Sequence, residues 1–411
     1  MGSIFSLLLA VVACSSAATP SPTVLTNGAG LATPSPIPTP SPTATPRPMA
    51  PATVRPGPAM TEARERQAAV RLADGRVLIL GGTVPFTGTC GMACIAPATA
   101  SVEIYDPSTG KFSPNGSLAE PRADGEALLL NDGRVLVSGG IGQYGDFVHT
   151  MEIYNYGQGT SVVVKPSVDM PGLPIDPTVV LLAEGRVLIA GGSYDDLNTT
   201  TNSTLIFDPA NGGFSNGPLM ADARQGATAT LLNDGRVLIV GGDHYQGNYG
   251  YANNNAELID PSHPLSQSTV LSSPHGATST LLSDGRVLVV GGGPYDSVAG
   301  CIIPAVPEVF DPRTERFTPV GPVITPRTGS AAIRIQDGRV ILFGGVDSNC
   351  AALGTVESFD PDSGTFQVIA TGFPKITDFS ATLLDDGRIL IAGGAGSAWN
   401  SMTAASWFLE P

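Results

Sequence analysis

The chain has 411 residues, with 36 Asp and Glu against 21 Lys and Arg, so its formal net charge is −15 at pH 7. Only three of the basic residues are lysines, and no basic patch is available to hold a phosphate backbone, which excludes nucleic acid as an expected partner. The 42% apolar fraction is sufficient for a large core, while 50 glycines and 36 prolines favour strands and turns.

The chain begins with the features of an export signal. Residues 4–13 are almost wholly apolar, a length that suits a signal peptide and is too short to span a bilayer. The run ends in Val11-Val12-Ala13-Cys14, which resembles the lipobox of bacterial lipoproteins. The resemblance implies that residues 1–14 are a lipoprotein-type signal and that Cys14 carries a lipid anchor at the cell surface. Cleavage after Ala18, which would remove Cys14, is the alternative.

Residues 15–50 are dominated by Pro, Thr and Ser, which supply 21 of the 36 residues. This composition cannot build a core and favours an extended, polyproline-like chain of about 3.1 Å per residue. We therefore predict a linker that separates the export signal from a folded domain spanning residues 51–411.

A single sequence unit recurs seven times within residues 51–411, at intervals of 49 to 58 residues. Each copy consists of an acidic residue, Gly and Arg, then an apolar run and a Gly-Gly pair. The copies begin at Asp74, Asp132, Glu184, Asp234, Asp284, Asp337 and Asp386. Because Asp-Gly between two apolar runs is typical of a hairpin, each unit is expected to begin with two antiparallel strands, a and b. A two-residue type I′ turn, with positive φ at both residues, is expected to join them.

Two further strands, c and d, complete each unit. Strand c ends in Asp-Pro, as in residues 102–107, and Pro cannot continue a strand ladder. In four units a Phe six residues after that Asp marks strand d, namely Phe112, Phe214, Phe317 and Phe366. The seventh unit stops after strand c, whereas residues 54–64 align with residues 214–224, a strand d that leads into the next unit. The N-terminal segment is therefore expected to complete the last unit and to close a ring without an exposed edge.

The repeat resembles that of the kelch family of β-propellers. The Gly-Gly pairs, such as Gly81-Gly82, and the aromatic residue of strand c, such as Tyr105, carry the resemblance over residues 51–411. It implies an all-β fold: a seven-bladed kelch-type β-propeller with four antiparallel strands per blade, closed by an N-terminal strand that completes the C-terminal blade. We expect one such domain in a monomer.

The b–c loops differ from blade to blade and leave a propeller on the same face as the d–a connections, so this loop face is the expected seat of binding. Tyrosine rings with neighbouring Asn and Asp suit a glycan or a protein ligand. The candidate ligand-binding residues in these loops are Tyr144, Tyr194, His244, Tyr245, Tyr249, Tyr251, Tyr295 and Trp399. The alternative is that they only stabilise long loops by local packing.

Four arginines stand ten residues before the turn acid of their unit, at the start of strand a on the loop face. They are Arg64, Arg122, Arg224 and Arg327. Their guanidinium groups could hold a ligand carboxylate by two parallel hydrogen bonds, which makes them candidate ligand-binding residues as well. The alternative, which the strongly acidic composition favours, is ion pairing with neighbouring loop acids.

Four cysteines follow the linker, and four cysteines in an exported protein suggest two disulfides. Cys90 and Cys94 lie in the b–c loop of blade 1, whereas Cys301 and Cys350 lie in those of blades 5 and 6. We predict the pairs Cys90–Cys94 and Cys301–Cys350, and three pairings are formally open. A metal site at Cys90 and Cys94 is the lesser alternative, because no His lies near them in sequence.

A seven-bladed kelch propeller is also the catalytic domain of copper radical enzymes similar to galactose oxidase. That resemblance implies a site of two His, two Tyr and a Cys cross-linked to one Tyr. The residues available for it are His244, Tyr245, His275, Tyr295 and Cys301. The family's adjacent Tyr-His pair stands here in the reverse order, and Cys301 is assigned above to a disulfide.

The sequence therefore favours a non-enzymatic, exported binding module that recognises a glycan or a protein. We expect no cofactor, no metal and no catalytic residue, and contact with a membrane only through the lipid anchor. A copper radical oxidase of carbohydrate alcohols is the alternative, because a propeller fold alone does not determine function.

Overall fold

The computed structural model describes most of the chain from residue 49 onward. The described residues are 49–88, 96–164, 173–193, 199–246, 249–253, 255–263, 268–272, 278–292, 295–296, 301–302, 305–398 and 400–411. For residues 249–251, 269–272, 295–296 and 301–302 only the backbone is described. The secondary structure of the described residues consists of β-strands. None of these residues forms a helix that is long and apolar enough to cross a membrane.

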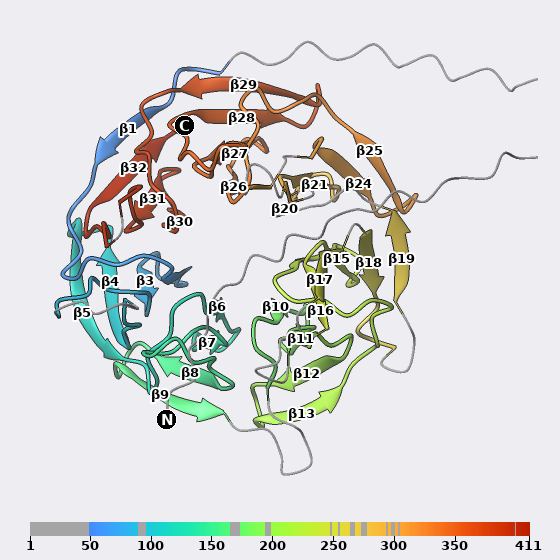
Figure 1. Ribbon diagram of the computed structural model, residues 1–411, viewed down its shortest axis with the longest axis horizontal. Helices are drawn as coiled ribbons and strands as arrows, with labels where there is room; N and C mark the ends of the chain where they lie inside the picture. Colours follow the sequence, from blue (N-terminus) through green and yellow to red (C-terminus); the bar gives the residue numbers. More distant parts are fainter. Residues whose placement is uncertain are drawn as a thin grey trace, which may run out of the picture. The chain divides into compact units, whose positions relative to one another are not determined.

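Seven four-stranded antiparallel sheets form a ring of blades around a common axis, with strand a innermost and strand d outermost (Figure 1). Blades 1 to 3 comprise β2 (Ala68–Arg71), β3 (Val77–Leu80), β4 (Ser101–Asp106) and β5 (Lys111–Ser117); β6 (Glu126–Leu129), β7 (Val135–Ser138), β8 (Met151–Asn155) and β9 (Thr160–Val164); and β10 (Thr178–Leu181), β11 (Val187–Ala190), β12 (Thr204–Asp208) and β13 (Gly213–Asn216).

The other four blades continue the ring in chain order. They comprise β14 (Thr228–Leu231), β15 (Val237–Val240), β18 (Asn255–Ile259) and β19 (Thr269–Ser272); β20 (Thr278–Leu281), β21 (Val287–Val290), β24 (Glu308–Asp311) and β25 (Arg316–Pro319); β26 (Ala331–Arg334), β27 (Val340–Phe343), β28 (Val356–Asp360) and β29 (Thr365–Ala370); and β30 (Ser380–Leu383), β31 (Ile389–Ala392), β32 (Ser406–Glu410) and β1 (Thr53–Pro56). Two short ribbons lie in b–c loops: β16 (Asp243–Gln246) with β17 (Tyr249–Ala252), and β22 (Tyr295–Asp296) with β23 (Cys301–Ile302).

The N-terminal strand closes the ring, as the sequence predicts. β1 pairs antiparallel with β32, the last strand of the chain, with Thr53 opposite Glu410 and Pro56 opposite Trp407. It thereby supplies strand d of blade 7 and covers an edge that would otherwise be unpaired. The expected seven-bladed β-propeller with four antiparallel strands per blade is confirmed.

Strand b is the centre of the core in every blade, because all four of its residues are buried. Its side chains alternate between the two sides of the sheet, and each side packs on a neighbouring blade. In β11, for example, Ile189 packs with Leu136 of blade 2, whereas Leu188 packs with Ile239 of blade 4. The four-residue apolar run of each repeat is thus explained by burial between two blades.

The a–b turns differ from the two-residue type I′ turns expected from Asp-Gly. In blade 1 the amide of Gly75 donates to the carbonyl of Leu72 (3.1 Å), and the amide of Leu72 donates to the carbonyl of Arg76 (2.8 Å). Only Gly75 of the turn has a positive φ, +86°. The loop is therefore a three-residue one, in which a turn is followed by a left-handed glycine, and the predicted type was wrong.

The Gly-Gly pairs lie at the contacts between adjacent blades. Both glycines have positive φ in all seven pairs. The amide of Gly82 donates to the carbonyl of Arg122 in blade 2 (2.8 Å), and a Cβ atom on Gly81 would come within 2.2 Å of that same oxygen. A side chain at Gly81 would push the two blades apart, so the repeat requires glycine there.

Candidate functional site

The four candidate arginines of the loop face are buried inside the blades. Arg64, Arg122, Arg224 and Arg327 are 0–1% exposed. In each case Nη1 donates to the carbonyl of the first glycine of the Gly-Gly pair in the same blade, at 2.7 to 3.1 Å. These four side chains therefore present no surface to a ligand.

Each arginine pairs with a glutamate on strand c of its own blade. Arg64 Nη2 lies 2.9 Å from Glu103 Oε1, and the partners of the other three arginines are Glu152, Glu257 and Glu357. The expected loop acid is also present in blade 1, where Glu62 lies 3.1 Å from Arg64, but the buried glutamate is the common partner. Burial lowers the pKa of Arg64, and the two carboxylates oppose this effect.

The glutamate also fixes the d–a connection that leads into the blade. Glu103 accepts hydrogen bonds from the backbone amides of Thr61 (2.7 Å) and Glu62 (3.1 Å), and the other three glutamates accept two equivalent bonds. We did not predict these glutamates from the sequence. The available signal was an acidic residue inside an otherwise apolar strand c.

Above the Gly-Gly pair, residues of the loops extend most blades by isolated β-bridges. In blade 2, Ile141 follows the Gly-Gly pair and bridges both Ala123 of the d–a connection and Phe147 of the b–c loop. In blade 3, Ser193 bridges Ile175 and Thr200 in the same way. These positions form the floor of the loop face, so their side chains determine what that face presents.

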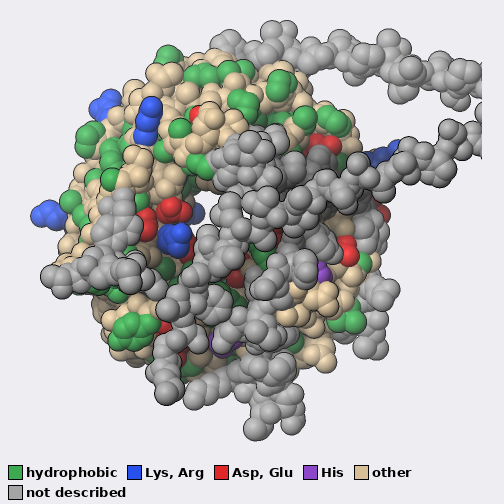
Figure 2. Space-filling view, viewed as in Figure 1, with side chains coloured by type: hydrophobic (Ala, Val, Ile, Leu, Met, Phe, Trp, Pro, Cys, Tyr) green, Lys and Arg blue, Asp and Glu red, His purple; other side chains and the backbone are tan. Residues whose placement is uncertain are grey.

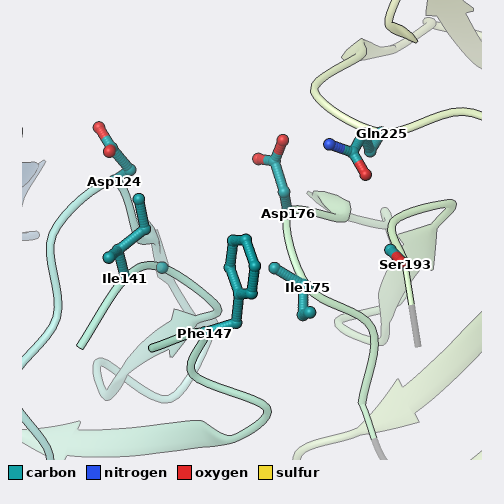
Figure 3. A pocket seen from close by; sticks show the side chains of 8 residues that line it. Asp124, Ile141, Phe147, Ile175, Asp176, Ser193 and Gln225 are labelled. Carbon is teal, nitrogen blue, oxygen red and sulfur yellow. The ribbon is translucent and has the colours of Figure 1, made fainter. Parts of the chain in front are cut away.

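A pocket opens on this floor between blades 2 and 3 and reaches blade 4 (Figure 3). It has a volume of about 310 Å³ and is lined by Asp124, Gly140, Ile141, Phe147, Ile175, Asp176, Ser193 and Gln225. In Figure 3 the ring of Phe147 lies between Ile141 and Ile175, while the carboxyl groups of Asp124 and Asp176 point away from this apolar floor. The pocket therefore combines an apolar base with a polar rim, as ligand sites usually do.

Asp124 and Asp176 occupy the same position of their blades, two residues after the arginine position, on the inner rim of the ring. Both have a positive φ, +55° and +50°, as do Arg66, Gly226, Gly329 and Asp378 at the equivalent positions of other blades. Backbone hydrogen bonds link neighbouring blades here, for example from Asp124 N to Arg66 O (2.9 Å). Glycine fits this conformation without strain, and Asp tolerates it better than most residues, so Asp124 and Asp176 can present a carboxylate here.

The rim is acidic, and Arg66 is its one basic partner near the pocket among the residues that the structure describes. Arg66 lies 3.2 Å from Asp124. Among the described residues no Lys or Arg is paired with Asp176, whose pKa is raised to about 6 by its enclosure and then by the charges of Asp124 and Asp243. Figure 2 shows acidic side chains next to a basic one beside the central opening.

A further carboxyl lies close to this rim on the innermost strand of blade 2. Glu126, the first residue of β6, accepts a hydrogen bond from the backbone amide of Val179 in blade 3 (3.0 Å). The side chain of Glu126 is exposed to water, but the inner strands surround it. The loss of hydration between these strands raises its pKa to about 7. The charge of Asp176 acts in the same direction, while the Val179 amide opposes it.

Three of the aromatic and histidine candidates have described side chains. Tyr144 is 81% exposed in the b–c loop of blade 2, three residues before Phe147. Tyr245 is half-buried, and its pKa is raised by burial and then by the charges of Asp243 and Asp176, which places it near the pocket. His244 Nδ1 lies 3.1 Å from the carbonyl of Ala223.

The remaining candidates are only partly placed. For Tyr249, Tyr251 and Tyr295 the backbone alone is described, in β17 and β22. Tyr194, Trp399 and Cys14 lie outside the described residues, together with the export signal and nearly all of the linker. Phe147, Asp124, Asp176 and Gln225 were not predicted. The available signal for the two acids was their fixed spacing of two residues from the arginine position.

The disulfide predictions are tested only at one cysteine. Cys350 is disulfide-bonded and lies in a turn in which its amide donates to the carbonyl of Asp347 (3.0 Å). The backbone of Cys301 pairs with Asp296, and its side chain is not described. Cys90 and Cys94 lie outside the described residues. The pairs Cys90–Cys94 and Cys301–Cys350 stay predictions.

The described residues contain no group of three or more His, Cys, Asp and Glu side chains placed to hold a metal ion. Of the residues considered for a copper radical site, His244 and Tyr245 have described side chains, and His275 lies outside the described residues. The expectation of no cofactor therefore stays a prediction.

The sequence and the fold were compared with those of known proteins. The family model described as the kelch motif matches residues 327–372, which span strands β26 to β29 of blade 6. No curated protein matches the sequence at a significant level. Among solved structures, a fungal alcohol oxidase of the AA5 family in complex with copper matches with a TM-score of 0.62 at 16% identity, covering 87% of this chain and 76% of that one. At this identity the likeness shows the fold alone.

Proposed function

We propose that this kelch-repeat β-propeller is a non-enzymatic binding module, which recognises a protein or a glycan through its loop face. The observation that carries the proposal is the pocket between blades 2 and 3, with an apolar base formed by Ile141, Phe147 and Ile175 and a rim that includes Asp176 and Gln225. Loops held by a rigid scaffold are the usual location of binding residues in such folds.

The exposure of the aromatic residues supports this proposal. Phe147 is 41% exposed and Tyr144 is 81% exposed, and exposed aromatic rings offer a large contact area to a ligand. Both lie in the b–c loop of blade 2, whereas Val162, another exposed apolar residue, lies on the outer strand β9. The apolar surface of the loop face is thus adjacent to a pocket, while that of the outer strand is not.

We also propose that the module is displayed outside the cell. The signal-like residues 1–14, with Cys14 as the site of lipid attachment, and the Pro-rich residues 15–50 support this placement. Nucleic acid is not a proposed partner, because the chain has a net charge of −15.

The proposal is tested by screening the full chain on glycan and peptide arrays and by measuring the affinity of any ligand found. We expect Phe147→Ala and Tyr245→Ala to weaken binding by about tenfold each, since aromatic side chains often dominate binding. Val162→Ala is the matched control, because it removes an exposed apolar side chain from the outer strand. Equal affinity of all three variants and the parent chain would exclude the loop face as the binding surface.

The alternative is a copper radical oxidase of carbohydrate alcohols, and a different measurement distinguishes it from the binding module. Tyr245 is affected by the charge of Asp176, and His244 contacts Thr200, which pairs with the lining residue Ser193. A copper-dependent alcohol oxidase has a similar fold, so the metal content and intact mass of the chain produced with copper are informative. One tightly held copper with a mass deficit for a Tyr–Cys cross-link would favour the oxidase. Absence of copper, with a deficit matching two disulfides, would favour the binding module.

A further inference from the structure

We infer that the pocket between blades 2 and 3 binds a basic side chain of a partner protein. The ammonium or guanidinium group would lie against Asp176 and Asp124, and the methylene stem would pack on Ile141, Phe147 and Ile175. This inference rests on the proposed function, because it names the ligand class of the same loop-face site.

The apolar base of the pocket is produced where the bridging positions of two blades meet. Ile141 and Phe147 come from blade 2, and Ile175 comes from the d–a connection of blade 3. In blade 3 itself the positions equivalent to Ile141 and Phe147 hold Ser193 and Thr200. The boundary between blades 2 and 3 therefore has an aliphatic surface that blade 3 does not repeat, and this surface matches a chain of methylene groups.

The charge of the rim selects the head group of the ligand. The carboxylates of Asp124 and Asp176 lie above the apolar base, and only Asp124 has a described basic partner, Arg66 at 3.2 Å. An anionic or uncharged ligand would leave Asp176 without a counter-charge, whereas a cation would pair with it. The net charge of −15 also favours the approach of cationic partners.

The lining favours a basic amino-acid side chain over an amino sugar, which shares the cationic group. A sugar ring presents several hydroxyl groups that need hydrogen-bond partners. Apart from the two carboxylates, Ser193 and Gln225 are the only polar side chains among the described lining residues, while the base of the pocket is aliphatic and aromatic. Lysine and arginine place a single charged end on an apolar stem, which is the distribution that the pocket complements.

The inference is tested by NMR on the full chain with ¹³C-labelled isoleucine δ1 methyl groups, since two isoleucines line the pocket. The signals of Ile141 and Ile175 are assigned with Ile141→Val and Ile175→Val. The probes are acetyl-Gly-Lys-Gly-amide, its arginine analogue and its norleucine analogue, which retains an aliphatic stem but has no charge. We expect the two basic peptides to shift both signals and to bind about tenfold more tightly than the norleucine peptide.

A matched pair of variants tests the role of the carboxylate. Asp176→Asn and Asp378→Asn make the same charge change at equivalent rim positions, with φ of +50° and +57°, but only Asp176 lines the pocket. Asparagine tolerates this conformation, so both variants should fold, with the remaining methyl signals as a check. We expect Asp176→Asn to weaken binding of the lysine peptide by about tenfold and Asp378→Asn to change it less than about twofold.

Three outcomes would overturn the inference. The norleucine peptide could bind as well as the lysine peptide, glucosamine could shift the Ile141 and Ile175 signals when neither basic peptide does, or no probe could shift them. If the arrays still reveal a ligand whose binding is weakened by Phe147→Ala, the proposed function stands without this inference. If the arrays and the probes both fail, the proposed function fails with it.

Discussion

At the scale of single residues, the buried arginine and glutamate occur together in four blades, and two other blades lack both residues. In blade 3, Pro174 and Leu205 occupy the two positions, and in blade 7 they are held by Ile376 and Trp407. Removing one partner of a buried ion pair leaves an uncompensated charge and costs about 3–5 kcal/mol, whereas an apolar replacement of both is often nearly neutral. The joint loss in these two blades follows from that asymmetry.

Blade 5 is the exception, because it retains only the acid. Glu308 lies at the glutamate position, while Pro274, which lies outside the described residues, stands ten residues before Asp284, where other blades have arginine. Glu308 is 8% exposed, and its Oε2 atom has no hydrogen-bond partner in the described part of the chain. Burial raises its pKa.

We therefore expect Glu308→Gln to increase the free energy of unfolding at pH 8 by about 1 kcal/mol. The folded state holds this carboxyl with a raised pKa, so ionisation disfavours folding above the ordinary value of 4.5. The gain should disappear as the pH falls to about 4, where the group is protonated in both states. Urea unfolding followed by circular dichroism at the two pH values measures the difference.

Glu357→Gln is the matched control for this prediction, since it makes the same exchange at the same position of blade 6. Glu357 lies 2.8 Å from Arg327 and also accepts two backbone amides, so its charge is compensated. We expect this variant to lower the free energy of unfolding by about 2 kcal/mol or more. A change of the same sign in both variants would contradict the assignment of Glu308 as an unpaired acid.

At the scale of elements, the ring depends on a strand from the opposite end of the chain. β1 pairs with β32 over four residues, and just before it Ala52 packs beside Ile369 and Leu409, with its amide bonded to the carbonyl of Ile369 (2.8 Å). Without this segment, blade 7 would have three strands and an unpaired edge. Such edges pair readily with other chains.

A chain that begins at Gly57 should therefore melt about 10 °C lower than a chain that begins at Met49, which retains β1. It should also self-associate, because the exposed edge of β32 can pair with a second molecule. Differential scanning calorimetry at one scan rate and size-exclusion chromatography measure the two effects. Equal melting temperatures and a monomeric truncated chain would show that β1 is dispensable for closure.

The a–b turn shows the limit of local sequence patterns for an element. An acidic residue followed by glycine correctly locates all seven hairpins, because a glycine with positive φ is needed there. It does not determine the length of the loop, which depends on whether Leu72 pairs with Arg76 across the turn. Asp-Gly-Arg occurs with a three-residue loop here because Asp74 accepts the amide of Arg76 (3.1 Å) and its Nε (2.9 Å).

At the scale of the whole molecule, the sequence predicts the ring of seven blades but not the pocket between blades 2 and 3. The blade count and the closure follow from a sequence unit that recurs about every fifty residues. The Gly-Gly pair, as at Gly81, marks each copy of this unit. The pocket follows from contacts between units, since Phe147 and Ile175 belong to different blades and neither stands out in its own repeat. The buried partner of Arg64 was missed for a different reason: Glu103 belongs to the same blade but lies 39 residues away in the sequence.

The enclosed carboxyls of the inner rim make the stability of the whole ring depend on pH. The pKa of Glu126 is raised to about 7, so between pH 4.5 and 7 the folded protein retains a proton that the unfolded chain has released. Stability should consequently fall as the pH rises through this interval, and the full penalty should be present above pH 7. Asp176, with a pKa raised to about 6, contributes in the same direction.

Glu126→Gln should remove much of this dependence while retaining an oxygen that can accept the Val179 amide. We expect the melting temperature of the variant to exceed that of the parent chain by about 1–3 °C at pH 8 and to equal it at pH 4. Glu184→Gln, which changes an exposed carboxylate in an a–b turn, is the control and should leave the slope between these pH values unaltered. A variant whose melting temperature falls at pH 8 would mean that ionised Glu126 stabilises the ring, and the enclosure of the inner rim would then not be the dominant effect.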